Sequence, residues 1–406
     1  MSMYMDVAAT TKPKPAVINA MMPYLQEQFH NPSSLYSDAK RVKIALDKAH
    51  ETVAKSINAK PNEIYFTSGG SEANCWAIQG FISNRLNHNK IPYIITTKIE
   101  HKSILDCVKN QRGAVKKFIG VDYYGFVDPD ELSNAIADFI NIGAKPKDIL
   151  VSIQFANNEV GSIQNIIALS DVAHMYGCVL HTDAVQAFTH TYIDVDMMGI
   201  DMLTASAHKI GGCKGTGFLY IRNNVKIDPL IYGSQMNGKR GGTENVAGIV
   251  GMATAVKLAK DDYKNSDALA MKRDYFMYKL LELGFKINGV LPDDDDENHK
   301  RLPNNINVML PDGIGGEVLL YALDVDDIQI GTGSACNSRS VKPSHVLKAM
   351  GRTDDECVQS IRITIPNDMT MDDIDEVVKS IEQGIKMLKS VGAEGVDSKA
   401  FMCYVK

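Results

Sequence analysis

Short apolar runs alternate with longer segments of helical periodicity along the first 260 residues of the chain. The apolar runs predict strands at 63–68, 92–97, 148–154, 178–183, 201–206 and 217–222, and helical segments follow from Ser71 to about Arg85 and from about Lys102. Runs such as ILVSI lack polar alternation, which is typical of strands covered on both faces. The pattern therefore predicts an α/β fold with a mainly parallel sheet flanked by helices.

A second, smaller unit is predicted to follow a helical segment at about 245–260. The segments MKRDYFMYKLLELGF, NNINVML and SIRITI indicate a small α+β domain after that helix. We therefore predict an N-terminal arm at 1–15, a large domain at 16–260 and a small domain at 261–406. The acidic stretch at 292–298 is interpreted as a solvated loop.

Composition narrows the functional classes. The chain has 406 residues and a formal net charge of −6, which gives it no overall attraction to nucleic acid or to acidic membranes. The first residues do not resemble a secretory signal, and no apolar run reaches the ~18 residues of a membrane span. Seven scattered cysteines contain no C-x-x-C pair, which argues against a disulfide framework or a zinc site and favours a reducing, cytoplasmic setting.

Polar residues follow several predicted strands, where ligands bind in open α/β sheets. In SGGSEAN, Gly70 and Ser71 at a helix start suit a phosphate, although a glycine turn with a serine cap is an equally ordinary structure. His101 in KIEHKS is either structural or functional. Asn158 in NNEVG either binds a ligand oxygen or caps a turn.

Two charged residues terminate apolar strands. Asp183 ends CVLHTD, and a buried carboxylate needs a cationic partner. Lys209 follows DMLTASAH; it is either a surface lysine or an amine whose pKa desolvation lowers. A phosphate cup, an aspartate and a lysine 26 positions later match the needs of pyridoxal phosphate (PLP), which takes a Schiff-base lysine and an acidic partner for its pyridine nitrogen.

Cys336 lies among small and polar residues in GTGSACNSRS. Cysteine is usually buried, whereas this composition indicates a mobile, solvent-facing loop. The thiol is therefore either a passive loop residue or a functional group that moves with the loop.

The motifs YMDVAATT, FTSGGSEAN, EHKSIL, NNEVGSIQ, HTDAVQA, SAHKIGGCKGTG, RGGTEN, GTGSACNS and SIRI together resemble the cysteine desulfurases, PLP enzymes of aminotransferase class V, and in particular the NifS/IscS type. The resemblance runs in order from about Tyr4 to about residue 390. It implies the PLP-dependent fold type I. Departures from the family pattern include Ser37 and Cys213.

The resemblance also implies roles for individual residues. Lys209 would form the Schiff base, Cys336 would attack the substrate sulfur, and Arg362 would bind the substrate carboxylate, to which Asn158 also lies close. Strand alternation puts Arg362 on a face opposite Ile361 and Ile363. The cofactor would be held by Gly70, Ser71, His101, Asn158, Asp183, Gln186, Ser206 and His208, and by Thr243 from a neighbouring subunit.

The implied activity is conversion of L-cysteine to L-alanine, with sulfur held on Cys336 as a persulfide and passed to an acceptor. The implied partners are a second copy of the chain and a sulfur-acceptor or iron–sulfur scaffold protein. A selenocysteine lyase, an epimerase or an aminotransferase would use the same PLP site. A catalytically silent sulfur-handling adaptor is the alternative outside enzymes.

Overall fold

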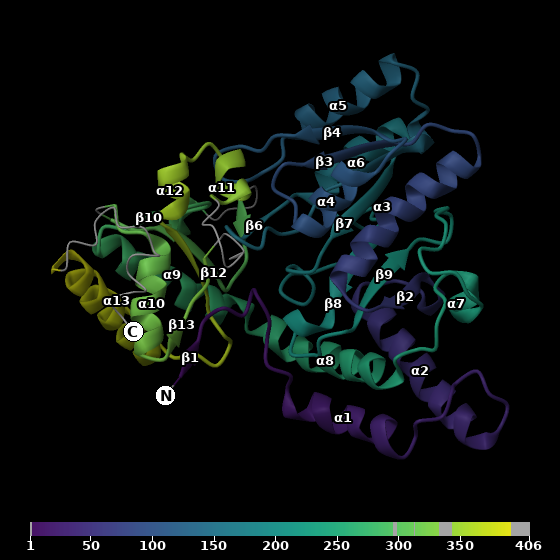
Figure 1. Cartoon of the computed structure of the whole chain (residues 1–406), viewed down its shortest axis with the longest axis horizontal. Coiled ribbons are helices and arrows are strands. Elements are labelled where there is room, and N and C mark those ends of the chain that lie inside the picture. Colours follow the sequence, from purple (N-terminus) through teal and green to yellow (C-terminus); the bar gives the residue numbers. More distant parts are fainter. Residues whose placement is uncertain (1, 295–298, 312, 333–342, 391–406) are drawn as a thin grey trace.

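A computed structural model of the chain describes residues 2–294, 299–311, 313–332 and 343–390 (Figure 1). Its largest element is a seven-stranded sheet in the order β2-β9-β8-β7-β5-β3-β4. The strands are β2 (Ile64–Thr67), β3 (Tyr93–Thr97), β4 (Val115–Ile119), β5 (Ile149–Ser152), β7 (Val179–Asp183), β8 (Met202–Ser206) and β9 (Gly217–Ile221). All six strands predicted from apolar runs are present.

The predicted mainly parallel sheet is confirmed. Strands β4, β3, β5, β7 and β8 run parallel, and only β9 is antiparallel to its neighbours β8 and β2. The sequence prediction missed β4. Its sequence, VKKFI, carries two lysines because β4 is an edge strand whose first four residues are partly or fully exposed.

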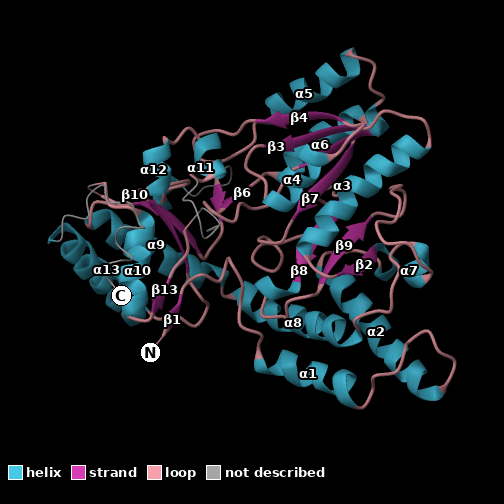
Figure 2. Cartoon of the chain, in the orientation of Figure 1, coloured by secondary structure: helices cyan, strands magenta, loops and turns pink. Residues whose placement is uncertain are grey.

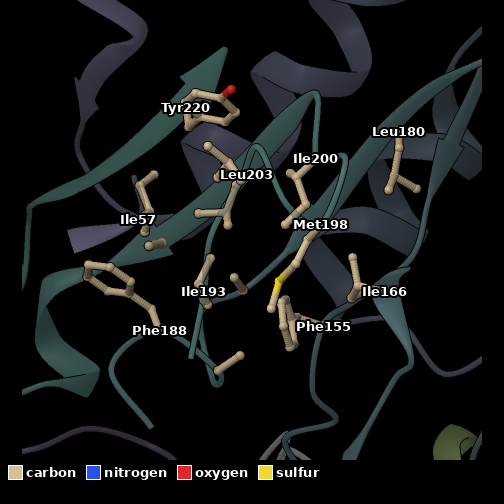
Figure 3. Close-up of a cluster of buried hydrophobic side chains, with 14 of the residues drawn as sticks. Ile57, Phe155, Ile166, Leu180, Phe188, Ile193, Met198, Ile200, Leu203 and Tyr220 are labelled. Atoms are coloured by element: carbon tan, nitrogen blue, oxygen red, sulfur yellow. The ribbon is translucent and has the colours of Figure 1, made fainter. Parts of the chain in front are cut away.

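Helices cover both faces of this sheet (Figure 2). One face packs against α3 and α4 through Phe81 and Ile104, and the other packs against α2, α5, α6 and α8. Figure 3 shows part of the core between the sheet and α2, α5, α6 and α8, where Leu203 and Tyr220 of the sheet lie near Ile193 and Met198. The helices are α1 (Pro15–Gln26), α2 (Ser37–Ser56), α3 (Gly70–Asn87), α4 (Lys102–Asn110), α5 (Pro129–Asn141), α6 (Ile166–Tyr176), α7 (Gln235–Gly238) and α8 (Val246–Lys264).

A second hydrophobic core lies in the C-terminal part. It is built on an antiparallel sheet of β10 (Lys286–Ile287), β12 (Asn305–Met309) and β14 (Ser360–Thr364). Ile361 and Ile363 point into this core, as strand alternation predicts, and Arg362 points away from it. The helices of this part are α9 (Ser266–Glu282), α10 (Gly316–Val325), α11 (His345–Ala349), α12 (Asp354–Val358) and α13 (Met371–Ser390).

The N-terminal segment joins the two parts. β1 (Met3–Tyr4) pairs with β13 (Ile328–Gln329), and Met5 belongs to the C-terminal core. The chain then crosses to the large sheet, where Thr11 bonds to the carbonyl oxygen of His208. β6 (Ser162–Ile163) and β11 (Lys300–Arg301) make a second link. The predicted boundaries at residues 15 and 260 stay predictions.

In the part of the chain that the structure describes, no helix is both long enough and apolar enough to cross a membrane.

Candidate active site

A cavity of about 1080 Å³ lies beyond the carboxyl ends of β3, β5, β7 and β8 and is closed on one side by the C-terminal part. This is the edge at which open α/β sheets bind ligands. Ten of the residues singled out from the sequence line it: Gly70, Ser71, His101, Asn158, Asp183, Gln186, Ser206, His208, Lys209 and Arg362. The fold thus gathers residues separated by up to 292 positions, while their individual roles stay predictions.

Two predicted residues are not part of this lining. Thr243 borders a different cavity of about 240 Å³, together with Tyr24 and Asn31. A residue that acts on a neighbouring subunit would lie away from its own site in this way. Cys336 lies outside the described residues, but Thr332 and Pro343, the nearest described residues on either side, both line the large cavity.

One end of the cavity suits an anion. The 18-residue helix α3 begins at Gly70, and its N-terminus carries partial positive charge beside Ser71, Ser206 and His208. Gly69 adopts φ +154°, which side chains rarely permit, and a Cβ on Gly70 would lie 2.8 Å from Val185 Cγ2. The tight turn before α3 therefore requires both glycines, and this turn forms the cup at the anion-binding end of the cavity.

Lys209 enters the cavity from the turn after β8. Its Nζ donates hydrogen bonds to the carbonyl oxygens of Ala8 and Ala9, the latter at 2.8 Å. Burial and, to a smaller extent, the nearby Arg362 cation lower the pKa of Lys209 to about 8, although Asp6 and Asp183 act in the opposite direction. About a tenth of this amine is therefore neutral at pH 7, far more than for a lysine with an ordinary pKa.

Asp183 is held at the end of β7 by two donors. Asn74 Nδ2 donates to Asp183 Oδ2 at 2.7 Å, and the Val185 amide donates to Oδ1 at 3.0 Å. The same Asn74 amide donates to Ser103 Oγ at 2.9 Å, and Ser103 Oγ lies 2.8 Å from His101 Nδ1. Asn74 and Ser103 thus connect the aspartate to the histidine through one hydrogen-bonded chain.

His101 caps helix α4. Its Nδ1 accepts a hydrogen bond from the Ser103 amide at 3.1 Å, so the neutral ring carries its proton on Nε2. Desolvation lowers the pKa of His101, although the Asp183 carboxylate acts in the opposite direction. The imidazole is therefore neutral at pH 7 and able to take up or release a proton.

Arg362 reaches the cavity from β14. Its Nη2 pairs with Asp6 Oδ1 at 2.6 Å, and its Nη1 donates to the Asn158 carbonyl oxygen at 3.1 Å. Among the described residues, the buried Nε has no hydrogen-bond partner. A guanidinium fixed on two sides and retaining a free buried donor suits recognition of a carboxylate.

This set of groups fits PLP. The cup at the start of α3 supplies donors for a phosphate, Asp183 supplies a carboxylate for a pyridine nitrogen, and Lys209 supplies an amine for an aldehyde. The close approach of Gly70 to Val185 supports the same fit, because the cup has no room for a larger side chain there.

The sequence prediction missed Asp6, Asn74 and Ser103, whose side chains orient Arg362, Asp183 and His101. Each lies within a motif that was recognised, namely YMDVAATT, FTSGGSEAN or EHKSIL. Membership of these motifs was the available signal. The partners themselves, such as Asp6 and Arg362 at 356 positions apart, could not be read from local pattern.

The lowered pKa of Lys209 predicts at which pH an amine-specific reagent labels this residue in the cofactor-free protein. Only the neutral amine reacts, so labelling is expected to reach half its maximum near pH 8 rather than near the ordinary 10.5. Quantitative peptide mass spectrometry across a pH series measures this midpoint. Asp6→Asn should move it down and Arg362→Gln should move it up. A midpoint near 10.5 would contradict the assigned burial.

Comparison with known proteins gives consistent matches over nearly the whole chain. The family model described as aminotransferase class-V matches residues 3–377. A protein named cysteine desulfurase IscS from Clostridium botulinum is 42% identical over 394 residues, covering 96% of this chain and 95% of that protein. A protein of the same name from Dictyoglomus turgidum is 42% identical over 392 residues, covering 96% and 95%.

Solved structures agree with the sequence matches. A NifS-like protein superimposes with a TM-score of 0.85 at 32% identity, covering 96% of this chain and all of that one. A NifS-like protein from Rickettsia africae gives 0.83 at 29% identity, covering 95% and 100%. A structure titled SspA in complex with cysteine gives 0.76 at 32% identity, covering 90% and 99%.

Proposed function

The chain belongs to the aminotransferase class V family, and we propose that within this family it is a PLP-dependent cysteine desulfurase. It converts L-cysteine to L-alanine and transfers the sulfur to its own Cys336. The observation that carries the proposal is the meeting of Lys209, Asp183 and Arg362 in one cavity. The names of the sequence relatives and a structural relative bound to cysteine support the same substrate.

Particular residues of this chain would hold the cofactor. Ser71, Ser206 and His208 would bind its phosphate, and Asp183 would bind its pyridine nitrogen. Lys209 would hold it covalently through the amine, and His101, Asn158 and Gln186 would contact the ring and its hydroxyl. Bound PLP withdraws electrons from the α-carbon of an amino acid and so makes the α-proton removable.

The remaining steps fall to side chains of the protein. Arg362 would bind the carboxylate of L-cysteine through its fork of donors, and thereby orient the α-carbon toward Lys209. The neutral Lys209 amine would take the α-proton. His101, with its proton on Nε2, is suited to pass a proton to or from the substrate thiol.

Cys336 would act as the nucleophile. Its thiolate forms a bond to the substrate sulfur while the carbon–sulfur bond of the substrate breaks, so that the carbon skeleton takes up a proton and leaves as alanine. Cys336 then carries the persulfide. The position of Thr332 and Pro343 in the cavity lining, on either side of the segment that contains Cys336, supports this role.

Two partners belong to this proposal. A second copy of the chain would bring its Thr243 to the phosphate, and the exposed apolar side chains Phe29, Leu35 and Tyr36 near the smaller cavity support such a contact. A sulfur-acceptor protein, such as a scaffold for iron–sulfur clusters, would receive the persulfide sulfur.

The proposal is tested by incubating the PLP-loaded enzyme with L-cysteine. We expect alanine to be released and one sulfur to be added to the tryptic peptide that contains Cys336, as measured by mass spectrometry. Parallel reactions with L-selenocysteine and with a keto-acid acceptor separate the alternatives. Activity confined to selenocysteine would identify a selenocysteine lyase, and amino transfer to the keto acid would identify an aminotransferase.

Arg362→Lys is expected to raise the KM for L-cysteine about 10- to 100-fold. Lysine keeps the charge but loses the planar fork and the contacts to Asp6 and Asn158. Steady-state kinetics measure the split between KM and kcat. Arg352→Lys is the matched control, because Arg352 stacks on Tyr123 outside the cavity lining. An unchanged KM in Arg362→Lys would remove Arg362 from substrate binding.

A further inference from the structure

Two cysteines that take no part in the proposed reaction meet behind the active site. Cys75 lies on α3 and Cys107 on α4, two helices that pack against each other on the same face of the large sheet (Figure 1). Cys75 Sγ lies 3.8 Å from the carbonyl oxygen of Ser103, which is one helical turn before Cys107 on α4, and both cysteines are free thiols. Two neighbouring thiols on packed helices are the reactants of a disulfide.

The surroundings of the two thiols differ. Cys107 is buried, with 7% of its surface exposed, and Gln111 Nε2 lies 3.9 Å from its sulfur. Cys75 is only partly buried, so small molecules can reach it. Interaction with the neighbouring Cys107 thiol lowers the pKa of Cys75 to about 7, whereas the pKa of Cys107 is raised by its interaction with Cys75 and by burial. Cys75 is therefore suited to react first and Cys107 to react second.

The pair adjoins the hydrogen-bonded chain that orients the active site. Cys75 directly follows Asn74 along α3, and its thiol donates to the Ser103 carbonyl oxygen at 3.8 Å. Ser103 and Asn74 in turn hold His101 and Asp183. A covalent bond between Cys75 and Cys107 would therefore fix α3 to α4 immediately behind the residues that would contact the cofactor.

We propose that Cys75 and Cys107 form an oxidisable dithiol, which hydroperoxides convert to an intramolecular disulfide between α3 and α4. The Cys75 thiolate attacks one peroxide oxygen, and the O–O bond breaks to give a sulfenic acid and hydroxide. The Cys107 sulfur then attacks the Cys75 sulfur and displaces water. Two thiols lose two electrons in total, and one hydrogen peroxide is reduced to two waters.

The test uses the PLP-loaded full chain carrying Cys336→Ser, so that the loop thiol does not consume the oxidant. The protein is treated with hydrogen peroxide, its remaining thiols are alkylated, and it is digested with trypsin without reductant. The expected product is a cross-link between the peptides 56–85 and 103–109, two hydrogens lighter than their sum and absent after reduction. Its rate of formation should rise as the pH passes about 7.

Matched variants locate the reaction. The cross-link should disappear in Cys75→Ser and in Cys107→Ser and persist in Cys178→Ser, which removes a buried thiol outside the pair. Two outcomes would overturn the proposal in the Cys336→Ser protein itself, without reliance on these variants. One is that, after treatment with hydrogen peroxide, Cys75 and Cys107 are alkylated to the same extent as Cys178. The other is that Cys75 proceeds to sulfinic acid while Cys107 remains a free thiol.

Discussion

Replacing Lys209 with alanine is expected to reduce turnover of L-cysteine by at least about 10³-fold. The substitution removes both the amine that would hold PLP and the base that would take the α-proton. Other lysines line the cavity, but the charged groups that shift the pKa of Lys209 are Arg362, Asp6 and Asp183, so no second lysine among the described residues shares its immediate surroundings. Alanine formation measured under saturating PLP tests the expectation, since loss of affinity for the cofactor alone would then be compensated.

Two further variants separate the roles of charge and proton transfer at this position. Lys209→Arg keeps a cation at this position, but the pKa of an arginine side chain is above 12, so no neutral base is available. This variant should therefore be as inactive as Lys209→Ala. Lys214→Ala, five positions later and outside the cavity lining, should retain full activity. If Lys209→Ala kept turnover within about tenfold of the unaltered enzyme, Lys209 would not be the catalytic amine.

Much of the architecture could be predicted from the sequence because the large sheet is buried. Strands such as β5 and β8, covered on both faces, are uninterrupted apolar runs, and a polar residue at the end of such a run is conspicuous. Asp183 and Lys209 were found in this way. The edge strand β4 was missed for the converse reason, since it is partly exposed and carries two lysines that interrupt its apolar run.

The side chains that orient the site could not be predicted by the same reasoning. Asp6 contacts Arg362 because β1 pairs with β13 and the following residues run beside β14, and neither pairing has a local signal. Asn74 contacts Asp183 because α3 packs across β7 and β8. Such contacts depend on the packing of elements, whereas sequence periodicity reports only which face of each element is buried.

The identity of the nucleophile depends on the family resemblance, because Cys336 lies outside the described residues. The described residues on either side of its segment, Thr332 and Pro343, both line the cavity. An ordinary thiol with a pKa near 8.5 is only about 3% thiolate at pH 7, so attack requires a base in the site. His101, whose neutral imidazole lines the cavity, or a base derived from the substrate would take this role.

Cys336→Ser is accordingly expected to abolish persulfide formation and to lower alanine release by about 10²-fold or more. A serine hydroxyl remains protonated at pH 7 and is a poor nucleophile toward sulfur, while the groups that hold PLP and the substrate are unchanged. Mass spectrometry of the peptide that contains residue 336 and a direct alanine assay provide independent measurements. Visible absorption of bound PLP should persist, which distinguishes a lost nucleophile from a lost cofactor.

Cys213→Ser is the matched control for this prediction, because Cys213 contacts Met21 outside the cavity lining and should transfer sulfur normally when replaced. Release of alanine by Cys336→Ser at the unaltered rate would mean that sulfur leaves the substrate without attack by this residue. The cavity formed by Lys209, Asp183 and Arg362 would then act as a lyase site, and the sulfur would appear in solution rather than on the protein.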